Sequence, residues 1–134
     1  MTFHASGTFE VKFVPQRLAD AEADPVLGRM AIHKTFTGDL RATGRGEMLT
    51  AGTPTKGSAG YVAIEHVSGN LQGRSGSFVL QHTGTMNRGA TELYVTVVPD
   101  SGSGELAGVS GTLSISMVEG KHFYQFEYTL PGRD

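Results

Sequence analysis

Glu65 and Arg74 are the first candidates for chemistry in this sequence, because the turn signals between them place them on facing strands. If Gly69-Asn70 forms a two-residue turn, Glu65 lies opposite Arg74. A carboxylate and a guanidinium on an apolar face lose their hydration, so the pair would need further hydrogen bonds. We expect this pair to fix the strand register. A role in binding a ligand or moving a proton is the alternative.

His82 and Lys34 are further polar residues that fall among apolar ones. Histidine can donate or accept a proton near neutral pH, although a hydrogen-bonded core histidine is the commoner case. Lys34 is either an outward lysine or an interior cation for a carboxylate or enolate oxygen. The candidate catalytic residues are therefore Glu65 as base, with His82 or Tyr61 as donor.

No metal or other cofactor is expected. The 5 histidines show no H-x-H or H-E-x-x-H spacing, and neighbouring Glu65 and His66 would point to opposite faces of a strand. The sequence contains 0 cysteines, which excludes disulfides, cysteine-ligated zinc and thiol catalysis.

Strand patterns dominate the chain, and turn signals rich in Gly, Asn and Asp separate them. The expected strands include residues 9–13, 30–36, 61–65, 77–82, 93–98, 113–117 and 122–130. Residues 16–24 (QRLADAEAD) are too short and polar for a core helix, so a surface loop is expected there. About eight strands at short intervals are typical of an all-β fold, a small closed antiparallel up-and-down barrel.

The turns also predict one shared apolar face. An Asn87-Arg88 turn would place His82 opposite Leu93, and a Glu119-Gly120 turn would place Ile115 opposite Tyr124. Cross-strand partners share a face because the side-chain period is two. We expect this face to be the barrel interior. It collects Tyr61, Glu65, Arg74, Phe78, Leu80, His82, Leu93, Val95, Val97, Leu113, Ile115, Met117, His122, Tyr124, Phe126 and Tyr128.

A short segment occurs twice. Residues 68–76 (SGNLQGRSG) align without gaps on residues 103–111 (SGELAGVSG), and residues 37–40 (TGDL) form a looser third copy. Either a duplication or the preference of turns for Gly and Ser explains the match. Because no helix follows, we expect these glycines at bends and close strand contacts rather than in phosphate loops.

Composition limits the possible partners. The 134 residues suit a single domain, expected to span residues 1–134. A net charge of −2 provides no basic field for nucleic acid. No apolar run reaches the roughly 18 residues of a membrane span, and the first residues lack a secretory signal pattern. The expected location is therefore the cytoplasm, with no membrane partner.

Two runs are distinctive, residues 60–86 (GYVAIEHVSGNLQGRSGSFVLQHTGTM) and residues 97–111 (VVPDSGSGELAGVSG). Together with GTFEVK (7–12), GRGEML (44–49) and HFYQFEY (122–128), they resemble a bacterial family of unknown function, DUF3224. Structurally known members of that family look like the allene oxide cyclase barrel. The resemblance therefore implies a small closed antiparallel barrel. It does not imply cyclase activity, because fold does not fix function.

Three functions fit these observations. The first is a barrel that binds a small hydrophobic molecule, because an interior of this size can hold one ligand. The second is an isomerase or cyclase that uses Glu65, His82 and Tyr61, and the third is a structural or interaction module with a filled interior. The residues expected to line a ligand are Lys34, Arg74, Phe78, Leu80, Val95, Ile115, Tyr124, Phe126 and Tyr128.

Self-association is also expected, as a homodimer or another homo-oligomer. The strand faces opposite to the interior still carry apolar residues, among them Val62, Ile64 and Val79. A lone barrel leaves such side chains in water, and a second copy would cover them.

Overall fold

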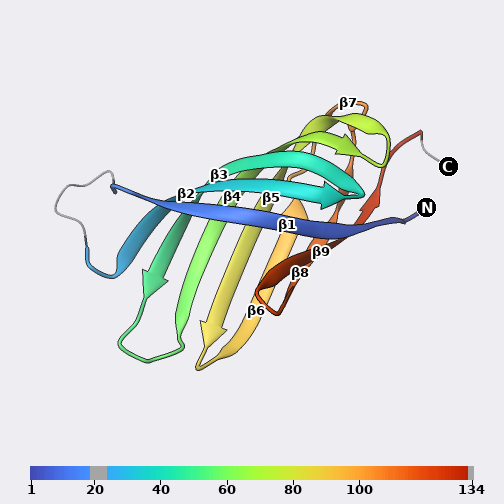
Figure 1. Cartoon of the computed structure of the whole chain (residues 1–134). Coiled ribbons are helices and arrows are strands. Elements are labelled where there is room, and N and C mark those ends of the chain that lie inside the picture. Colours follow the sequence, from blue (N-terminus) through green and yellow to red (C-terminus); the bar gives the residue numbers. More distant parts are fainter. Residues whose placement is uncertain (19–23, 133–134) are drawn as a thin grey trace.

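The computed structural model describes residues 1–18 and 24–132, and every helix or strand that it assigns in this part of the chain is a β-strand (Figure 1). The strands are β1 (Phe3–Gln16), β2 (Leu27–Gly38), β3 (Leu40–Gly52), β4 (Ala59–Leu71), β5 (Arg74–Asn87), β6 (Ala90–Val97), β7 (Ser103–Gly104), β8 (Ser110–Val118) and β9 (Lys121–Thr129). The predicted loop over residues 16–24 begins with the last residue of β1, and residues 19–23 lie outside the described residues.

Eight of these strands close into an antiparallel barrel. Each strand from β1 to β5 pairs with the next one along the chain, β6 pairs with β8, β8 pairs with β9, and β9 returns to β1. The two-residue strand β7 lies outside this ring and pairs with the start of β5. The predicted all-β, closed up-and-down barrel is therefore confirmed, with one extra short strand.

The seam between β6 and β8 is the least hydrogen-bonded part of the ring. A single register pair, Thr96 with Thr112, joins these two strands in the described part of the chain. By contrast, β1 and β9 pair along the whole run from Phe3 to Phe9. The barrel is thus closed by one weak joint and otherwise by long ladders.

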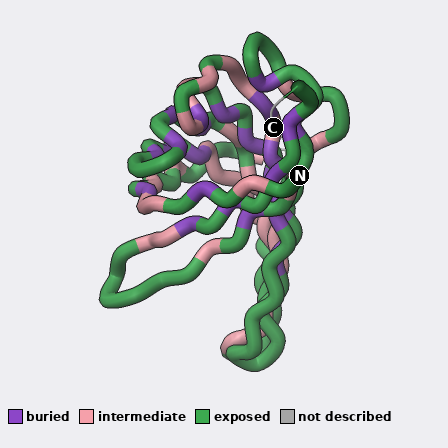
Figure 2. The backbone as a smooth tube through the Cα atoms, turned by 90° about the vertical axis from the view of Figure 1, so that its right-hand side faces the viewer, coloured by how far each residue is buried: buried purple, intermediate pink, exposed green. Residues whose placement is uncertain are grey.

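Most of the face predicted to be the interior is buried inside the barrel, but Met117, next to the β8–β9 turn, is 61% exposed. Phe78, Leu80, Val95, Tyr124 and Phe126 are buried, whereas the next residues along their strands are exposed or half-buried. Tyr61 and Ile115 share this face and are half-buried. Figure 2 shows that burial is concentrated along the body of the barrel, while the hairpins that project from it are exposed.

Two of the predicted turns occur at other residues than expected. The β4–β5 hairpin turns at Gln72-Gly73 instead of Gly69-Asn70, with φ values of 46° and 92°. The β5–β6 hairpin turns at Arg88-Gly89 instead of Asn87-Arg88, with φ values of 51° and 93°. Positive φ at both central residues suits the right-handed twist of a hairpin, and glycine adopts it without a steric cost.

The third predicted turn, Glu119-Gly120, is confirmed, and Ile115 pairs with Tyr124 as expected. In the two corrected hairpins every cross-strand partner changes. Glu65 pairs with Leu80 rather than Arg74, and His82 pairs with Val95 rather than Leu93. The interior set is unaffected, because the partner changes by six residues in the first hairpin and by two in the second, and an even change leaves each side chain on the same face.

The repeated segment closes one end of the barrel. Its three aligned leucines, Leu40, Leu71 and Leu106, are each no more than 1% exposed and belong to one core cluster. The turns that carry them hydrogen-bond to one another, since Gln72 N donates to Asp39 O at 2.9 Å and Glu105 N donates to Ser75 O at 2.9 Å. The start of β1 and the end of β9 lie at this end (Figure 1).

The opposite end of the barrel is open. Residues 53–58, between β3 and β4, contact the β5–β6 turn, where Gly89 N donates to Gly57 O at 2.9 Å and Arg88 N donates to Ser58 Oγ at 3.0 Å. Inward-facing side chains near this end remain partly exposed, Met86 to 41% and Leu93 to 37%. One end of the barrel is therefore packed, and the other forms a mouth.

Replacing Leu71 with alanine tests the closed end. Leu71 is fully buried, so Leu71→Ala should lower the free energy of unfolding by about 2–5 kcal/mol through lost burial and the cavity left behind. The measurement is a denaturant titration. The control is Leu49→Ala on the outer face, where half of the leucine is already exposed, and it should change stability by about 0.5 kcal/mol or less. Equal effects of the two substitutions would contradict the assignment of Leu71 to a packed end.

Candidate functional site

Three ionisable side chains meet inside the barrel at one carboxylate oxygen. Glu65 Oε1 accepts hydrogen bonds from Lys34 Nζ at 3.1 Å and from His82 Nε2 at 3.0 Å. The exposed fractions are 0% for Glu65, 7% for Lys34 and 3% for His82. These are the only buried polar or charged residues in the described part of the chain. A carboxylate is thus held between two nitrogen donors within an apolar core.

The register of four adjacent strands brings these groups together. Lys34 lies on β2, Glu65 on β4 and His82 on β5, with β3 between the lysine and the carboxylate. Strand β3 passes through the site at Gly44, which has no side chain to separate them. A Cβ built at Gly44 would lie 2.1 Å from Glu65 Oε2. The carboxylate therefore occupies the space that a larger residue at position 44 would fill.

Lys34 is the interior cation, so the alternative of an outward, snorkelling lysine is wrong. Its ammonium nitrogen lies 4.6 Å from the ring centroid of Phe9 and 5.4 Å from that of Phe36. The face of an aromatic ring attracts a cation, most strongly where water is excluded. The two rings therefore stabilise the buried ammonium group, in addition to its ion pair with Glu65.

Glu65 is ionised at neutral pH. Burial raises the pKa of this carboxyl, but the hydrogen bond from His82 and the charge and hydrogen bond of Lys34 together outweigh burial, so its pKa lies below the ordinary value. The second carboxylate oxygen, Oε2, is fully buried and has no hydrogen-bond partner among the described residues. The stability of the ion is thus carried by the two donors at Oε1.

The predicted pairing of Glu65 with Arg74 is wrong. Arg74 lies beside the Gln72-Gly73 turn at the closed end, where it pairs with Leu71 in the register. Leu80 takes the place opposite Glu65, and the cation that meets the carboxylate comes from β2, two strands away. A buried ion pair does exist, as expected, but it joins different strands. Arg74 therefore lies apart from the other candidate site residues.

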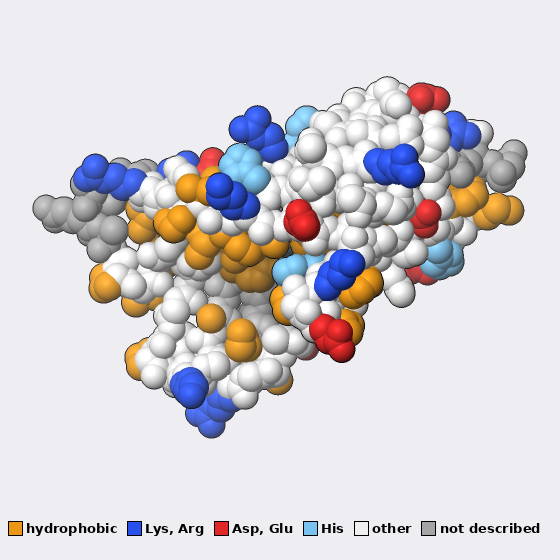
Figure 3. Space-filling view, in the orientation of Figure 1, with side chains coloured by type: hydrophobic (Ala, Val, Ile, Leu, Met, Phe, Trp, Pro, Cys, Tyr) orange, Lys and Arg blue, Asp and Glu red, His pale blue; other side chains and the backbone are white. Residues whose placement is uncertain are grey.

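The barrel mouth contains an apolar pocket of about 430 Å³. Its lining includes Met30, Met48, Thr50, Ala59, Tyr61, Gly84, Met86, Thr91 and Leu93, contributed by strands β2 to β6. Figure 3 shows hydrophobic side chains around the hollow below β1. The three methionines were not among the predicted site residues. The alternation along each strand places the three methionines on the inward face. Grouping them around one pocket also required the correct strand register.

Tyr61 forms one wall of this pocket, above the charged cluster. Its ring covers Gly84 on the neighbouring strand, where an added Cβ would lie 2.3 Å from the ring. Burial, together with the negative charge of Glu65, raises the pKa of the Tyr61 hydroxyl. Tyr61 is therefore a neutral phenol beside the pocket, able to donate or accept a hydrogen bond.

Most of the other predicted ligand-lining residues are packed into the closed half of the barrel. Phe78, Leu80, Val95, Phe126 and Tyr128 are at most 2% exposed. Phe126 stacks on both Phe78 and Tyr128, and the Tyr128 hydroxyl donates to Gln72. Ile115 is half-buried and packs against the same core.

The Tyr124 hydroxyl has a structural role as well. It accepts a hydrogen bond from Leu40 N at 2.8 Å and lies 2.8 Å from Thr37 O, to which it donates. Its ring edge also packs against Phe36. Tyr124 thus fastens the β2–β3 turn to the core, and its polar atom is already occupied by the backbone.

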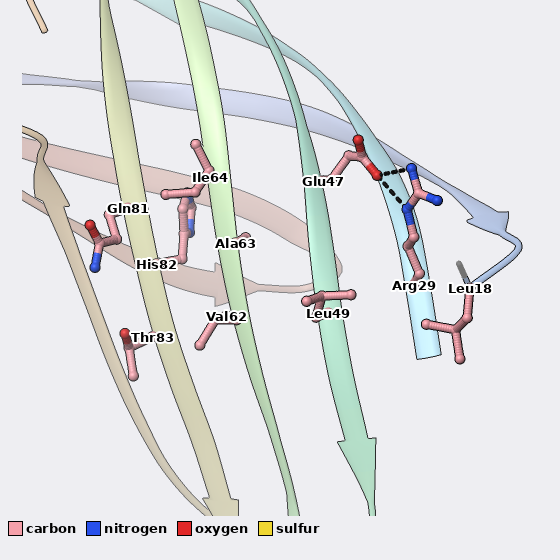
Figure 4. Close-up of a pocket in the computed structure, with 10 residues that line it drawn as sticks. All are labelled: Leu18, Arg29, Glu47, Leu49, Val62, Ala63, Ile64, Gln81, His82 and Thr83. Atoms are coloured by element: carbon pink, nitrogen blue, oxygen red, sulfur yellow. Dashed lines mark hydrogen bonds and ion pairs between the residues drawn. The ribbon is translucent and has the colours of Figure 1, made fainter. Parts of the chain in front are cut away.

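A second hollow of about 680 Å³ lies on the outer face of β2 to β5 (Figure 4). Leu49, Val62 and Ile64 line it and are 50–52% exposed, and the ion pair between Arg29 and Glu47 borders it. Val62 and Ile64 face outward as expected, so self-association through this face stays a prediction. The lining of this hollow also includes Ala63 and His82, whereas the lining of the mouth pocket includes neither. We place the candidate site in the mouth because inward-facing side chains of five strands line it.

The described residues contain neither a metal-binding cluster nor a membrane-spanning helix. No group of three or more His, Asp or Glu side chains there could hold a metal ion. No helix in this part of the chain is long and apolar enough to cross a membrane.

Comparison with known proteins identifies relatives without an assigned activity. A family model described as a protein of unknown function (DUF3224) matches residues 5–128. A crystal structure of a DUF3224 protein of unknown function from Shewanella oneidensis superposes with a TM-score of 0.92 at 49% sequence identity, covering 99% of this chain and 100% of that one. No curated protein matches.

Replacing Glu65 with glutamine tests the buried ion pair. Glu65→Gln leaves the Lys34 ammonium in the core without its counterion, which should lower the free energy of unfolding by about 3–5 kcal/mol. A denaturant titration at neutral pH measures the change. Glu47→Gln is the control, because that carboxylate pairs with Arg29 at the surface, and surface pairs contribute little. An unchanged midpoint for Glu65→Gln would show that the pair does not hold the strands together.

The contribution of Glu65 should also depend on pH. The folded-state pKa is depressed, so the stabilisation is complete above the unfolded-state pKa of about 4.3 and is lost as pH falls toward the folded-state pKa. The difference in unfolding free energy between the wild type and Glu65→Gln should therefore be constant near neutral pH and shrink in acid. Parallel denaturant titrations from pH 7 downward measure it. A difference that grows in acid would mean that Glu65 is protonated in the native protein.

Proposed function

The chain belongs to the DUF3224 family, which has no assigned function, and we propose that it binds a small hydrophobic molecule in the mouth pocket of the barrel. The observation that carries this proposal is the lining of the pocket. Its walls are almost entirely apolar, and inward-facing residues of five neighbouring strands contribute them. Ligand pockets combine such apolar walls with a few placed polar groups.

The volume of the pocket suits a compact ligand. About 430 Å³ falls within the usual range for small-molecule sites. Met30, Met48 and Met86 lie on three different strands around it. Methionine is unbranched and polarisable, so these side chains can adjust to the outline of an apolar molecule. The packed closed end does not compete for this role, because its side chains already fill it.

A filled barrel, as in a purely structural module, would bury these mouth side chains. Instead, Met86 and Leu93 face inward and remain about two-fifths exposed. Apolar surface that is turned inward but left in contact with solvent is the surface that a hydrophobic ligand would cover. The partly open mouth therefore favours binding over a purely structural role.

The test is a fluorescence titration with the neutral hydrophobic dye N-phenyl-1-naphthylamine. We expect saturable binding by the wild type. Ala59→Trp places an indole at the pocket, where Ala59 is exposed and its enlargement disturbs no core contact. It should weaken binding about tenfold, which corresponds to about 1.4 kcal/mol.

The matched control is Val62→Trp, which adds the same ring on the outer face of the same strand. It should leave the affinity for the dye unchanged. Loss of binding in this variant with retention in Ala59→Trp would place the ligand on the outer face and overturn the proposal. Absence of saturable binding by the wild-type protein would overturn it as well.

A further inference from the structure

Basic side chains form a row across the outer face of β2, β3 and β4. The strand register places His33 opposite Arg45, and Arg45 opposite His66. All three side chains are exposed. Neighbouring strands of a sheet lie about 4.8 Å apart, so these groups make one continuous row of hydrogen-bond donors. In Figure 3, Lys, Arg and His side chains gather along the upper edge of the molecule.

A row of hydroxyl groups lies directly beside the basic row. Two residues away along the same three strands, Thr35 pairs with Thr43, and Thr43 pairs with Ser68. These residues are exposed and line a hollow of about 590 Å³. The hollow also includes Thr37 and Arg41, which face outward from β2 and β3. Its outward-facing side chains are therefore all polar, and they are mostly hydrogen-bond donors.

Two arginines flank this hollow from the same strand. Arg41 and Arg45 are the outward-facing residues on either side of Thr43. Guanidinium groups on long side chains can converge above Thr43, and each binds phosphoryl oxygens through a fork of N–H donors. The ion pairs among the described residues involve neither arginine. Both guanidinium groups are therefore free to bind an anion from solution.

The carboxylates that border this surface have cations or donors of their own. Glu47, the next outward-facing residue of β3, pairs with Arg29. Asp39, in the β2–β3 turn, accepts a hydrogen bond from the backbone of β1. Glu10 lies on β1 at the end of the hydroxyl row, and Lys12 follows it on the same face. The outer hollow thus stays cationic, although the whole chain has a net charge of −2.

We infer that this outer hollow binds the phosphoryl group of a small, soluble phosphate monoester. Such a group carries nearly two negative charges and three strong acceptor oxygens. Arg41 and Arg45 approach it from two sides, and the hydroxyl group of Thr43 donates to it from below. Docking on a membrane requires apolar side chains that enter the lipid, and the outward-facing side chains here are polar. This site is separate from the mouth pocket and does not rest on the proposed function.

The test is a nitrogen-15 NMR titration with glycerol 2-phosphate, a polar phosphate monoester, in a buffer without phosphate. The wild type should show saturable shifts centred on the amide signals of Thr35, Thr43 and Ser68. Arg45→Gln should weaken binding by about tenfold or more, because a hydrogen bond between charged groups contributes at least that much. Arg41→Gln should have a similar effect. Both arginines are exposed, so neither substitution should unfold the protein.

The matched control is Arg88→Gln, which removes the same charge at the exposed β5–β6 turn. Glutamine suits that position, because Gln72 is the first residue of the β4–β5 turn and has a similar φ. Arg88→Gln should leave the affinity for glycerol 2-phosphate unchanged. A loss of affinity equal to that of Arg45→Gln would mean that overall charge attracts the ligand, and it would overturn the site.

Two further probes test the class of ligand. Acetate, with one charge and two oxygens, should bind about tenfold more weakly than glycerol 2-phosphate, and equal affinities would overturn the assignment to a phosphoryl group. Phosphatidylcholine vesicles that contain phosphatidic acid should not sediment the protein. Binding to these vesicles without binding of glycerol 2-phosphate would overturn the soluble ligand. Absence of saturable shifts with glycerol 2-phosphate in the wild type would overturn the inference and leave the mouth pocket proposal untouched.

Discussion

A single buried carboxylate constrains this barrel more than any other group. An ion in an apolar core is tolerated only when hydrogen bonds and opposite charge compensate for its lost hydration. Glu65 obtains both from Lys34 and His82. That requirement fixes the relative positions of β2, β4 and β5 and demands a residue without a side chain at position 44 of β3. The relative positions of four strands, β2 to β5, are thus linked through the carboxylate of Glu65.

The two halves of the barrel satisfy different physical demands. At one end, Leu40, Leu71 and Leu106 come from three copies of one turn motif and fill the interior. At the other end, longer strands extend beyond the packed core and leave methionines around a hollow. The charged cluster lies where these halves meet. The packed half surrounds the cluster with apolar side chains, and the hollow half leaves apolar side chains in contact with solvent.

The sequence determined which face each residue occupies but not which residue lies opposite it. Alternation alone placed Phe78, Ile115 and Tyr124 on the correct face, because any even change of partner preserves the face. The partner of Glu65 was wrong because the turn at Gln72-Gly73 was mistaken for one at an asparagine. In all three two-residue hairpins the second turn residue is glycine, which was the better signal. The ion pair of Lys34 with Glu65 was not predicted, because β3 lies between their two strands. A turn position in the sequence predicts only which residues of two directly paired strands lie opposite each other.

The circumference of the barrel can change most easily at the seam between β6 and β8. Full ladders fix the spacing of every other pair of neighbours in the ring, but one bridge, Thr96 with Thr112, holds this joint. A groove of about 670 Å³ follows it, with Tyr94 on one side and Ser114 on the other. Separation of these strands breaks few hydrogen bonds, so the circumference can grow there at small cost. Because Thr91 and Leu93 of β6 line the mouth pocket, separation of the strands at this seam would also change the width of the pocket.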